Sequence, residues 1–487
     1  MKRTLEALMV LLAAVLLLGL MSRPAFAGDA RPLHVADAVR LALANNLGLE
    51  VRRDEAEIAL GAGEAARGQF DVRLAGEGSL GAKESAPYLP DGVEKEETAG
   101  VSLGASKKFI TGTEVGVTWK NGRYSSTPAS PLLDPAWSSG LSLTVRQPLL
   151  QGLGIERQTA SLRAAETRSD ASRELVGFEA ANLAARVKAA YWNLFYAWQE
   201  KRVKELSLSL ARKLSEETKE RIAAGTLAKV DIHQPRSEVA RREEGLISAD
   251  RLIGLYEDEL RLLVNAPVLG GPFVPADKPP TAAVTPDVDA VLKRALAGRP
   301  DIRAAELELR AAGIESERAE DNLRPSLDMV GSVGQGGTDS SYGDSLGDAV
   351  DNPETEWQAG LVLAMPLENS AAKGLRRQAG AASRKAANSL ALLRLEVEKS
   401  VRTTVRDVQL AQKAMEATAK TALATKKRLE AEEAKFAVGR ATTLDVLSAQ
   451  EAYAQALSYE KQSEVGYALA LAELERIQGR VGEGLGL

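Results

Sequence analysis

Two long stretches of the chain carry apolar residues at helical spacing. Between Val176 and Gly225, and again between Leu375 and Val438, Ala, Leu, Glu, Lys and Arg dominate and proline is absent, which favours helix. The apolar positions on one face of each stretch are Leu206, Leu210 and Leu214, then Val397, Val401, Val405 and Val408. A helix this long must pack along a partner. The pattern predicts antiparallel helical hairpins that turn at Gly225 and Gly439, with alanines such as Ala381, Ala382, Ala386 and Ala387 allowing close approach.

Six other segments alternate apolar and polar residues with a period of two, which is typical of strands. They are VRLAGEGSLGA, AGVSLGASKKF, TEVGVTWKN and SSGLSLTVRQPLL in the first half, and SLDMVGSVGQGG and WQAGLVLAMPL in the second. The polar segments between them, such as GTDSSYGDSLGDAVDNPETE, are expected to be exposed loops. A few strands leave open edges, so we expect several subunits to share one barrel.

Aromatic residues are expected to cluster at the ends of these strands, and two interpretations of them remain open. They can anchor a barrel at the lipid–water boundaries, or they can be plain strand residues. The aromatics concerned are Tyr88, Trp119, Tyr124, Trp137, Tyr342 and Trp357.

The chain is an internal duplication. A shift of 253 residues places Leu43 on Leu296 and Phe70 on Leu323, and a shift of 214 places Gly225 on Gly439 and Asp231 on Asp445. Each half is therefore expected to contain a helix, a strand insert and a long helical hairpin. Residues 266–287 contain six prolines, so they cannot continue a helix, and we expect an extended linker on the outside.

The predicted organisation follows from these patterns. Residues 1–27 have a positive start, an apolar core and a small-residue cleavage site, which indicate a signal peptide. The other predicted segments are a first repeat at 28–265 (insert about 70–148, hairpin about 155–265, tip near 225), a linker at 266–287, a second repeat at 288–479 (insert about 325–367, hairpin about 371–479, tip near 439) and a short tail at 480–487.

Composition limits the possible chemistry. The 67 acidic and 62 basic residues nearly balance, so nucleic acid is not an expected partner. Cysteine is absent, which excludes disulfides and thiolate sites. His34 and His233 have no carboxylate-rich neighbours in the sequence, so no metal site is expected. Gly76–Gly81 matches G-x-G-x-x-G but is followed by more strand, so it fails the context of a nucleotide-binding loop. No catalytic residue and no cofactor is expected, and we do not interpret the chain as an enzyme.

Together these features resemble the TolC-like outer membrane efflux protein family. The matching segments are AVRLALANN, VRQPLLQGLG, LAMPLENSAAKGLRRQA and the two tips AGTLAKVD and VGRATTLD. The resemblance implies a mixed α and β fold, in which long helical hairpins form a periplasmic α-barrel and strands join a shared trimeric outer-membrane β-barrel. It implies a homotrimer, embedded in outer-membrane lipid, that acts as the passive exit duct of a tripartite efflux or type I secretion system. The implied partners are a periplasmic adaptor and an inner-membrane pump or ABC exporter.

The resemblance also assigns roles at the tips. The implied constriction residues are Asp231, Asp445, Ser448 and Phe436, and the implied adaptor-docking residues are Gly225, Thr226, Leu227, Gly439, Arg440 and Ala441. Phe436, Ala441 and Ser448 replace a tyrosine, an arginine and an aspartate of the family's best-known entrance, and Arg221 and Arg440 are candidate substitutes. The first insert holds four strand candidates where the family needs two.

Simpler interpretations stand beside these roles. Gly225 and Gly439 can serve only to end helices in a left-handed conformation. Asp231 and Asp445 can serve as helix caps, a role compatible with lining a pore. The alternative function for the whole chain is a soluble periplasmic coiled-coil adaptor or scaffold.

Overall fold

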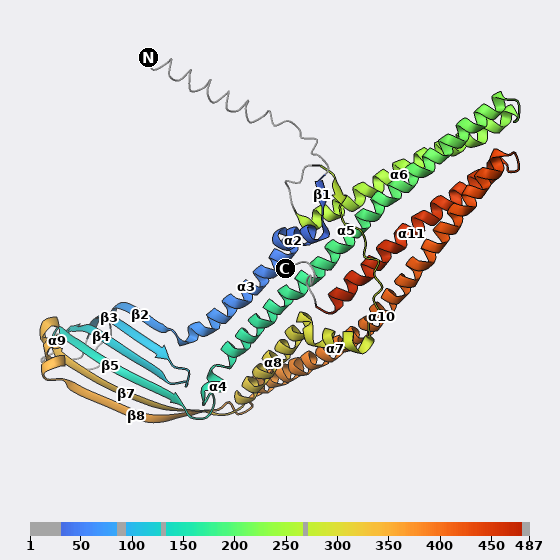
Figure 1. The fold of residues 1–487 in the computed structure, drawn as a ribbon. Helices are drawn as coiled ribbons and strands as arrows, with labels where there is room; N and C mark the ends of the chain where they lie inside the picture. The colour runs from blue at the N-terminus through green and yellow to red at the C-terminus, as the bar shows by residue number, and fades with distance from the viewer. Residues whose placement is uncertain (1–30, 85–93, 128–132, 266–270, 480–487) are drawn as a thin grey trace, which may run out of the picture. The chain divides into compact units, whose positions relative to one another are not determined.

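The computed structural model describes residues 31–84, 94–127, 133–265 and 271–479. The predicted signal peptide, Tyr88 and the predicted tail lie outside these residues. The chain forms two compact units, and Figure 1 shows their elements. The first comprises Met1–Arg53, Leu175–Ile302 and Leu393–Leu487, and the second comprises Asp54–Glu174 and Arg303–Leu392. The mixed helical and strand fold class predicted from the sequence is confirmed.

Two long helical hairpins dominate the first unit. Helices α5 (Ala160–Ala223) and α6 (His233–Val264) form one, and α10 (Ser370–Ala437) and α11 (Thr443–Ile477) form the other; α5 and α10 begin in the second unit. Val397, Val401, Val405 and Val408 are all buried, as their spacing predicts, but Leu206 is exposed and only Leu214 of its series is buried. A four-residue step advances 400° around a helix, so such a series drifts off the buried face.

Each half begins with two helices where the sequence predicts one. They are α2 (Val35–Asn45) and α3 (Leu47–Arg67) in the first half, and α7 (Val288–Gly298) and α8 (Pro300–Asp321) in the second. The breaks fall at Asn46 and Arg299, which are 253 residues apart, and both residues have extended backbones. The duplication therefore preserves this break as well as the hairpin tips.

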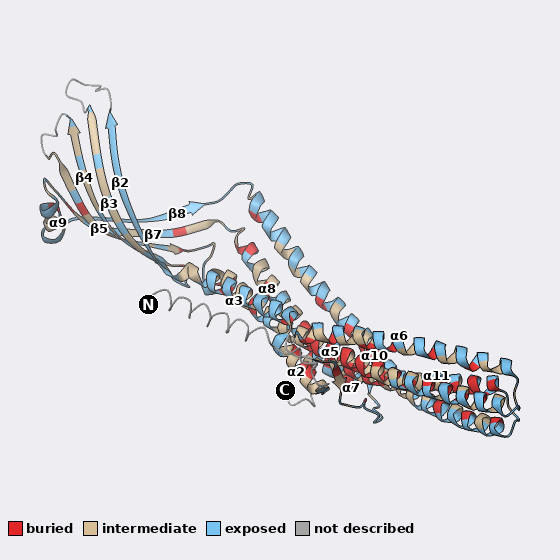
Figure 2. Ribbon diagram, turned by 90° about the horizontal axis from the view of Figure 1, so that it is seen from above, coloured by how far each residue is buried: buried red, intermediate tan, exposed pale blue. Residues whose placement is uncertain are grey.

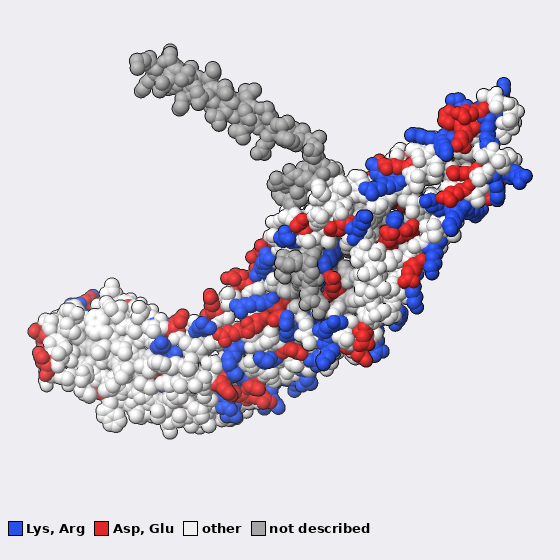
Figure 3. All heavy atoms as spheres, viewed as in Figure 1, with Lys and Arg blue, Asp and Glu red and all other residues white. Residues whose placement is uncertain are grey.

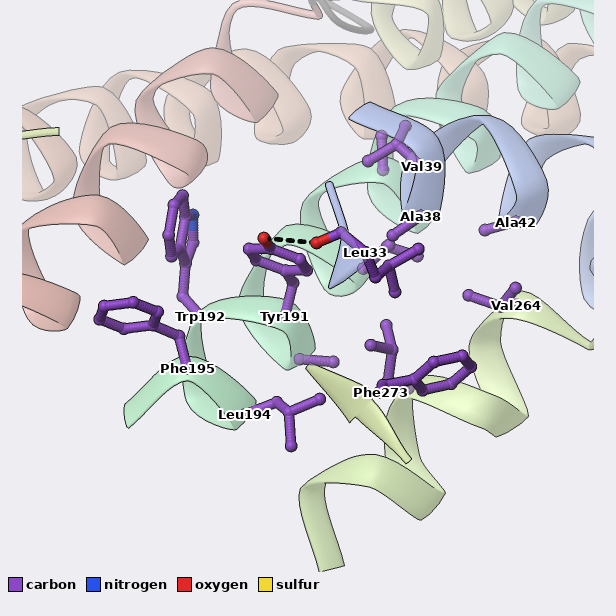
Figure 4. Packing of buried hydrophobic residues seen from close by; sticks show 14 of the residues in the cluster. Leu33, Ala38, Val39, Ala42, Tyr191, Trp192, Leu194, Phe195, Val264 and Phe273 are labelled. Atoms are coloured by element: carbon purple, nitrogen blue, oxygen red, sulfur yellow. Dashed lines mark hydrogen bonds between the residues drawn. The ribbon is translucent and has the colours of Figure 1, made fainter. Parts of the chain in front are cut away.

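The core of the first unit surrounds Tyr191 on α5. Strand β1 (Arg31–Leu33) pairs in parallel with β6 (Phe273–Pro275). Figure 4 shows Phe273 packed among Tyr191, Leu194 and Val264. The linker is thus only partly external, because its buried phenylalanine contributes to the core. Figure 2 shows buried residues gathered on the helices of this unit, whereas the strands of the other are exposed or intermediate with few buried residues.

One six-stranded antiparallel sheet forms most of the second unit, in the order β2-β3-β4-β5-β7-β8. Its strands are β2 (Val72–Glu84), β3 (Lys95–Lys108), β4 (Glu114–Thr127), β5 (Ala136–Pro148), β7 (Ser326–Asp339) and β8 (Glu354–Ala364). Each of the six predicted strand segments falls on one of these strands, four of them running up to three residues beyond it, and Gly76–Gly81 lies within β2. Short helical segments are η1 (Gly68–Phe70), α4 (Ile155–Gln158) and η2 (Lys229–Ile232).

The expectation of an exposed loop between β7 and β8 is wrong. Helix α9 (Tyr342–Asp351) lies there, capped by Ser341, whose side chain accepts from the Asp344 N–H. Tyr342 therefore belongs to a helix rather than to a strand end. Its ring contacts the Trp137 ring edge-on, with the ring centroids 6.0 Å apart. Trp119 lies in the middle of β4 rather than at its end.

Candidate functional site

Both hairpin tips are built by the same backbone motif. Gly225 and Gly439 have φ of +76° and +75°, in the left-handed region where glycine carries no Cβ penalty. The Gly225 N–H donates to Ile222 O at 3.1 Å and the Thr226 N–H to Arg221 O at 2.9 Å. At the second tip the N–H groups of residues 439 and 440 donate to Phe436 O at 3.0 Å and Lys435 O at 2.8 Å. This pair of bonds is the Schellman motif, so both glycines end helices.

The aspartates of the two tips cap the returning helices. Thr442 Oγ1 accepts from the Asp445 N–H at 3.2 Å, while Asp445 Oδ2 accepts from the Thr442 N–H at 2.8 Å. This reciprocal arrangement is a capping box. In the first tip Asp231 Oδ2 accepts from the Ala228 N–H at 3.0 Å, but Ala228 has no hydroxyl to return the bond. The second tip therefore has both hydrogen bonds of a capping box, whereas the first tip has only one of them.

The capping bonds also act on the charge of Asp445. Hydrogen bonds from the Thr442 hydroxyl and then from its amide lower the pKa of Asp445 below its ordinary value of 3.8, because both bonds favour the charged form. Asp445 and Ser448 are exposed one helical turn apart on α11. A carboxylate held ionised at an exposed tip can attract cations.

Phe436 does not lie with these exposed residues. Its side chain is only 3% exposed and packs in a cluster with Leu214, Leu429, Val446, Leu447 and Ala449. Phe436 was expected at a constriction with Asp445 and Ser448, but its ring does not share their exposed side, because an apolar ring beside these side chains is more stable buried than facing water. The ring fills the space between the hairpins.

Arg221 joins the two hairpins at this cluster. Its guanidinium lies 4.1 Å from the Phe436 ring centroid, and its Nη2 donates to Ala437 O at 3.3 Å. Gln450 of α11 adds a second link, because its Nε2 donates to Leu210 O of α5 at 3.3 Å. The sequence singled out Arg221 as a candidate substitute at the entrance, but it gave no signal for Gln450.

A third link uses charged residues on α6 and α11. Arg241 bonds to Glu451 at 2.9 Å and to Glu238 at 2.8 Å. Arg242 is buried and donates to Ser207 O at 2.9 Å and Glu238 Oε1 at 2.7 Å. Sequence reasoning missed all of these, because arginines and glutamates occur along the whole hairpin and only the packing selects the pairs.

The remaining predicted docking residues are accessible. Gly225, Thr226, Gly439 and Arg440 are exposed, and Leu227 and Ala441 are half-buried. Two apolar residues that the sequence did not single out lie beside them. Val230 is 68% exposed and Leu444 is 58% exposed, and they occupy equivalent positions 214 residues apart. Each tip therefore presents an exposed apolar side chain at the same point.

His34 has a partner that its sequence neighbours do not reveal. Its Nδ1 lies 2.8 Å from Asp277 Oδ1. Asp277 Oδ2 also accepts from the Val35 N–H at 2.7 Å, and the Tyr191 hydroxyl lies 3.1 Å from it. Tyr191 accepts from the N–H of Ala276 at 3.1 Å and lies 2.8 Å from Leu33 O, and Figure 4 shows this last bond. We call these residues the Tyr191 clamp, because they fasten β1 and the linker to α5.

No described helix has both the length and the apolar character required to cross a membrane. No group of three or more His, Cys, Asp or Glu side chains suited to a metal ion occurs among the described residues.

Comparison with known proteins bears on this arrangement. Residues 291–480 match the model of the outer membrane efflux protein family. No curated protein matches the sequence. Among solved structures, a membrane protein from Pseudomonas aeruginosa is 18% identical with a TM-score of 0.70, over 91% of this chain and 93% of that chain.

Two outer membrane channels show the same similarity of fold. MtrE from Neisseria gonorrhoeae is 20% identical with a TM-score of 0.66, over 92% of this chain and 89% of that chain. CmeC from Campylobacter jejuni is 15% identical with a TM-score of 0.66, over 93% of this chain and 87% of that chain. The resemblance noted in the sequence is confirmed: residues 291–480 match the outer membrane efflux protein family, and the chain as a whole has the fold of the TolC-like outer membrane channels.

Proposed function

We propose that this protein is the outer-membrane exit duct of a tripartite efflux or type I secretion system. In this proposal three copies form a passive channel, whose strands lie in the outer membrane and whose helices extend into the periplasm. The family match indicates a channel protein rather than an enzyme. The passive channel does not select its substrate, which is chosen by the inner-membrane pump or ABC exporter.

A row of side chains across the sheet carries the proposal. One residue from each strand lies in register on the same face: Leu74, Ala105, Val117, Leu143, Val333 and Trp357. Leu74 is 81% exposed and Trp357 is 75% exposed. The neighbouring row on the other face is Arg73, Ser106, Gly116, Thr144, Ser332 and Gln358. We call these the apolar face and the polar face.

The two faces have the character that a barrel wall in lipid requires. Outward positions of such a wall are apolar and lumen positions are polar, with a period of two along each strand. The polar face encloses a hollow of ≈ 710 Å³ lined by residues of all six strands, so it is the concave side. Figure 3 shows the strands almost without charge, while acidic and basic residues alternate over the helices. The alternative of a soluble coiled-coil scaffold leaves this exposed apolar face unexplained.

The hairpin tips supply the proposed periplasmic entrance. Asp445 and Ser448 on the exposed side of α11, with Asp231 at the other tip, are the proposed constriction residues. The turns around Gly225 and Gly439 are the proposed docking sites of the adaptor. The exposed Val230 and Leu444 support this role, because exposed apolar side chains at a rigid turn suit a partner protein.

The test is reconstitution of the purified protein into planar bilayers. We expect trimers in detergent and single-channel conductance that prefers cations. Asp445→Asn should reduce the cation preference, whereas Asp287→Asn, at the α7 cap, should not. A monomer that needs no detergent and does not conduct would contradict the proposal. Unchanged selectivity of Asp445→Asn would remove only Asp445 from the constriction.

A further inference from the structure

The six-stranded sheet ends in two open edges. Within the described part of the chain, strand β2 (Val72–Glu84) pairs only with β3, and β8 (Glu354–Ala364) pairs only with β7. Each edge presents a row of unpaired backbone N–H and C=O groups over 13 and 11 residues. Within lipid, each unsatisfied group of this kind costs several kcal/mol. The occupant of each edge must therefore supply a strand of its own.

A second copy of the chain supplies such a strand in the required direction. Neighbouring strands of the sheet are antiparallel throughout. Because the number of strands is even, β2 and β8 run in opposite directions. Strand β8 of one copy can thus lie antiparallel against β2 of the next, which continues the alternation that single-chain barrels also require.

The faces of the two edges also match. Leu74 and Leu80 of β2 and Trp357, Leu361 and Leu363 of β8 all lie on the apolar face and are all exposed. Edge pairing in this direction keeps every apolar side chain on one side of the wall. A shift by one residue would move them into the lumen, so only pairings between same-face residues are stable.

We infer that three copies close edge to edge, β8 of each against β2 of the next, into one barrel of eighteen strands. The number rests on the trimer of the proposed function and on the six strands of each chain. Barrels of 16 to 18 strands enclose an aqueous channel, whereas barrels of about 8 strands are filled by side chains. With strands about 4.8 Å apart and a tilt of about 40°, the wall has a diameter of about 36 Å.

The hairpin β3–β4 sets this width. Strands β2 and β5 run in opposite directions, so removal of Lys95–Thr127 would leave an antiparallel sheet of four strands. A trimer of that chain would close with about 12 strands, and at equal tilt its cross-section would fall about two-fold. The polar face of the hairpin carries nine small residues: Thr98, Gly100, Ser102, Gly104, Ser106, Gly116, Thr118, Gly122 and Ser126. It also carries five longer ones, Glu96, Lys108, Glu114, Lys120 and Tyr124. The hairpin therefore lengthens the wall while adding few large side chains to the lumen.

Disulfide cross-linking of the full trimer tests the edge pairing, because the chain has no cysteine. Gly78→Cys places a thiol on the apolar face of β2, where an added Cβ meets nothing within 4 Å. It is combined in turn with Thr355→Cys, Trp357→Cys, Ala359→Cys and Leu361→Cys on the same face of β8. Antiparallel neighbours have Cα atoms about 4.5–5.5 Å apart, which suits a disulfide. We expect at least one combination to give covalent trimers.

The matched controls place the second cysteine where the proposed pairing predicts no contact with Gly78→Cys. Glu356→Cys and Gln358→Cys lie on the polar face of β8, and Leu143→Cys lies on the apolar face of the central strand β5. None should cross-link to Gly78→Cys between subunits. Cross-links in the single variant Gly78→Cys, which would show β2 pairing with β2, or cross-links to Leu143→Cys would overturn the inference.

Lumen width gives an independent measurement. Ser142→Cys, on the polar face of β5, is treated with maleimide-linked polyethylene glycols of graded mass, in the intact trimer and in a variant lacking residues 95–127. The shortened barrel has about two-fold less cross-section, so it should exclude polymers that the intact barrel admits. If both trimers fold and exclude polymers above the same mass, the inference is overturned. If the shortened chain does not fold, the disulfide cross-links alone test the inference. Absence of trimers and conductance would instead contradict the proposed function, whereas a conducting trimer without β2–β8 cross-links would contradict only the eighteen-stranded barrel.

Discussion

The guanidinium of Arg221 stacks on the ring of Phe436, 4.1 Å from its centroid. Arg221 belongs to α5 and Phe436 to α10, so this contact joins the first hairpin to the second. The Arg221 Nη2 reinforces it by donating to Ala437 O at 3.3 Å. A planar cation that stacks and donates at once cannot be replaced by lysine without loss.

The first prediction is that Arg221→Ala loosens the tips. Loss of a half-exposed cation–π contact costs about 0.5–1 kcal/mol, which is small for the whole chain but concentrated at one end of the hairpins. We expect faster tryptic cleavage after the exposed Arg440 and a higher single-channel conductance. Arg221→Lys should be intermediate, and Arg236→Ala, at an exposed arginine of α6, should leave both unchanged. Equal cleavage rates for wild type and Arg221→Ala would show that Gln450 and Arg241 hold the hairpins without it.

The second prediction uses the difference between the two caps. Thr442→Ala removes the hydroxyl of the capping box and should lower the free energy of unfolding by about 1 kcal/mol. Ala228→Thr should raise it, because Ala228 has the same extended backbone and Asp231 already accepts from its N–H. Thermal unfolding followed by circular dichroism checks both signs. If both substitutions changed the melting temperature in the same direction, the claim that only the second tip has a hydroxyl cap would be contradicted.

The same cap predicts a dependence on pH. The pKa of Asp445 is lowered by the Thr442 hydroxyl and amide, so the contribution of the ionised cap is present above the unfolded pKa of about 3.9. It is lost as the pH falls through the lower folded pKa. The melting temperatures of wild type and Thr442→Ala should therefore draw closer in strongly acidic solution, where only the bond from the Asp445 N–H to Thr442 Oγ1 still distinguishes them. A difference that stays constant throughout the acidic range would contradict this.

The third prediction concerns the Tyr191 clamp. The hydrogen bond that His34 donates to Asp277, and then the charge of Asp277, raise the pKa of His34 above 6.5. Burial alone would raise the pKa of Asp277, but hydrogen bonds from His34, Val35 and Tyr191 outweigh burial and lower it. The His34 contribution is present below pH 6.5 and lost as the pH rises through its folded pKa, while that of Asp277 is present above its unfolded pKa and lost in acid.

Hydrogen exchange of β1 and residues 273–277 measures the clamp. Protection should be greatest between about pH 4 and 6.5 and should fall above the folded pKa of His34. His34→Gln should remove the fall on the alkaline side and keep the acidic one. Tyr191→Phe should reduce protection at every pH, because it leaves the Asp277 amide without its Tyr191 acceptor at a cost of about 1–3 kcal/mol. Protection in His34→Gln that still falls over the same alkaline range would contradict the role of His34.

The sequence predicted the elements of this fold better than the contacts between them. Period-two alternation identified all six strands, and the glycines located both tips, because these features depend on local backbone chemistry. The pairing of His34 with Asp277 joins residues 243 positions apart, and only the folded chain brings them together. Phe436 was assigned to a constriction by its position in a motif, but its burial depends on the packing of three helices, α5, α10 and α11. Asp445 was expected as a helix cap, whereas Thr442, its partner in the capping box, was not.

The fourth prediction tests why a glycine occupies position 337 in β7. A Cβ there would lie 2.5 Å from Ala349 N and 2.5 Å from Ser345 O, so α9 could not keep its position. That position also holds the buried Ser345 Oγ 3.0 Å from Ser139 Oγ. Gly337→Ala should displace α9, with a cost of about 1–3 kcal/mol from overpacking and faster proteolysis within residues 340–353.

Gly334→Ala is the matched control for this prediction, since it lies in the same strand and its Cβ would make only ordinary contacts at 3.7 and 3.8 Å. It should leave the proteolysis rate unchanged, because strand propensity favours alanine slightly over glycine. Ser345→Ala removes the Ser345–Ser139 hydrogen bond but leaves the close approach of α9 to Gly337 unchanged. If Ser345→Ala alone reproduces the effect of Gly337→Ala, the hydrogen bond rather than the missing Cβ fastens α9 to the sheet.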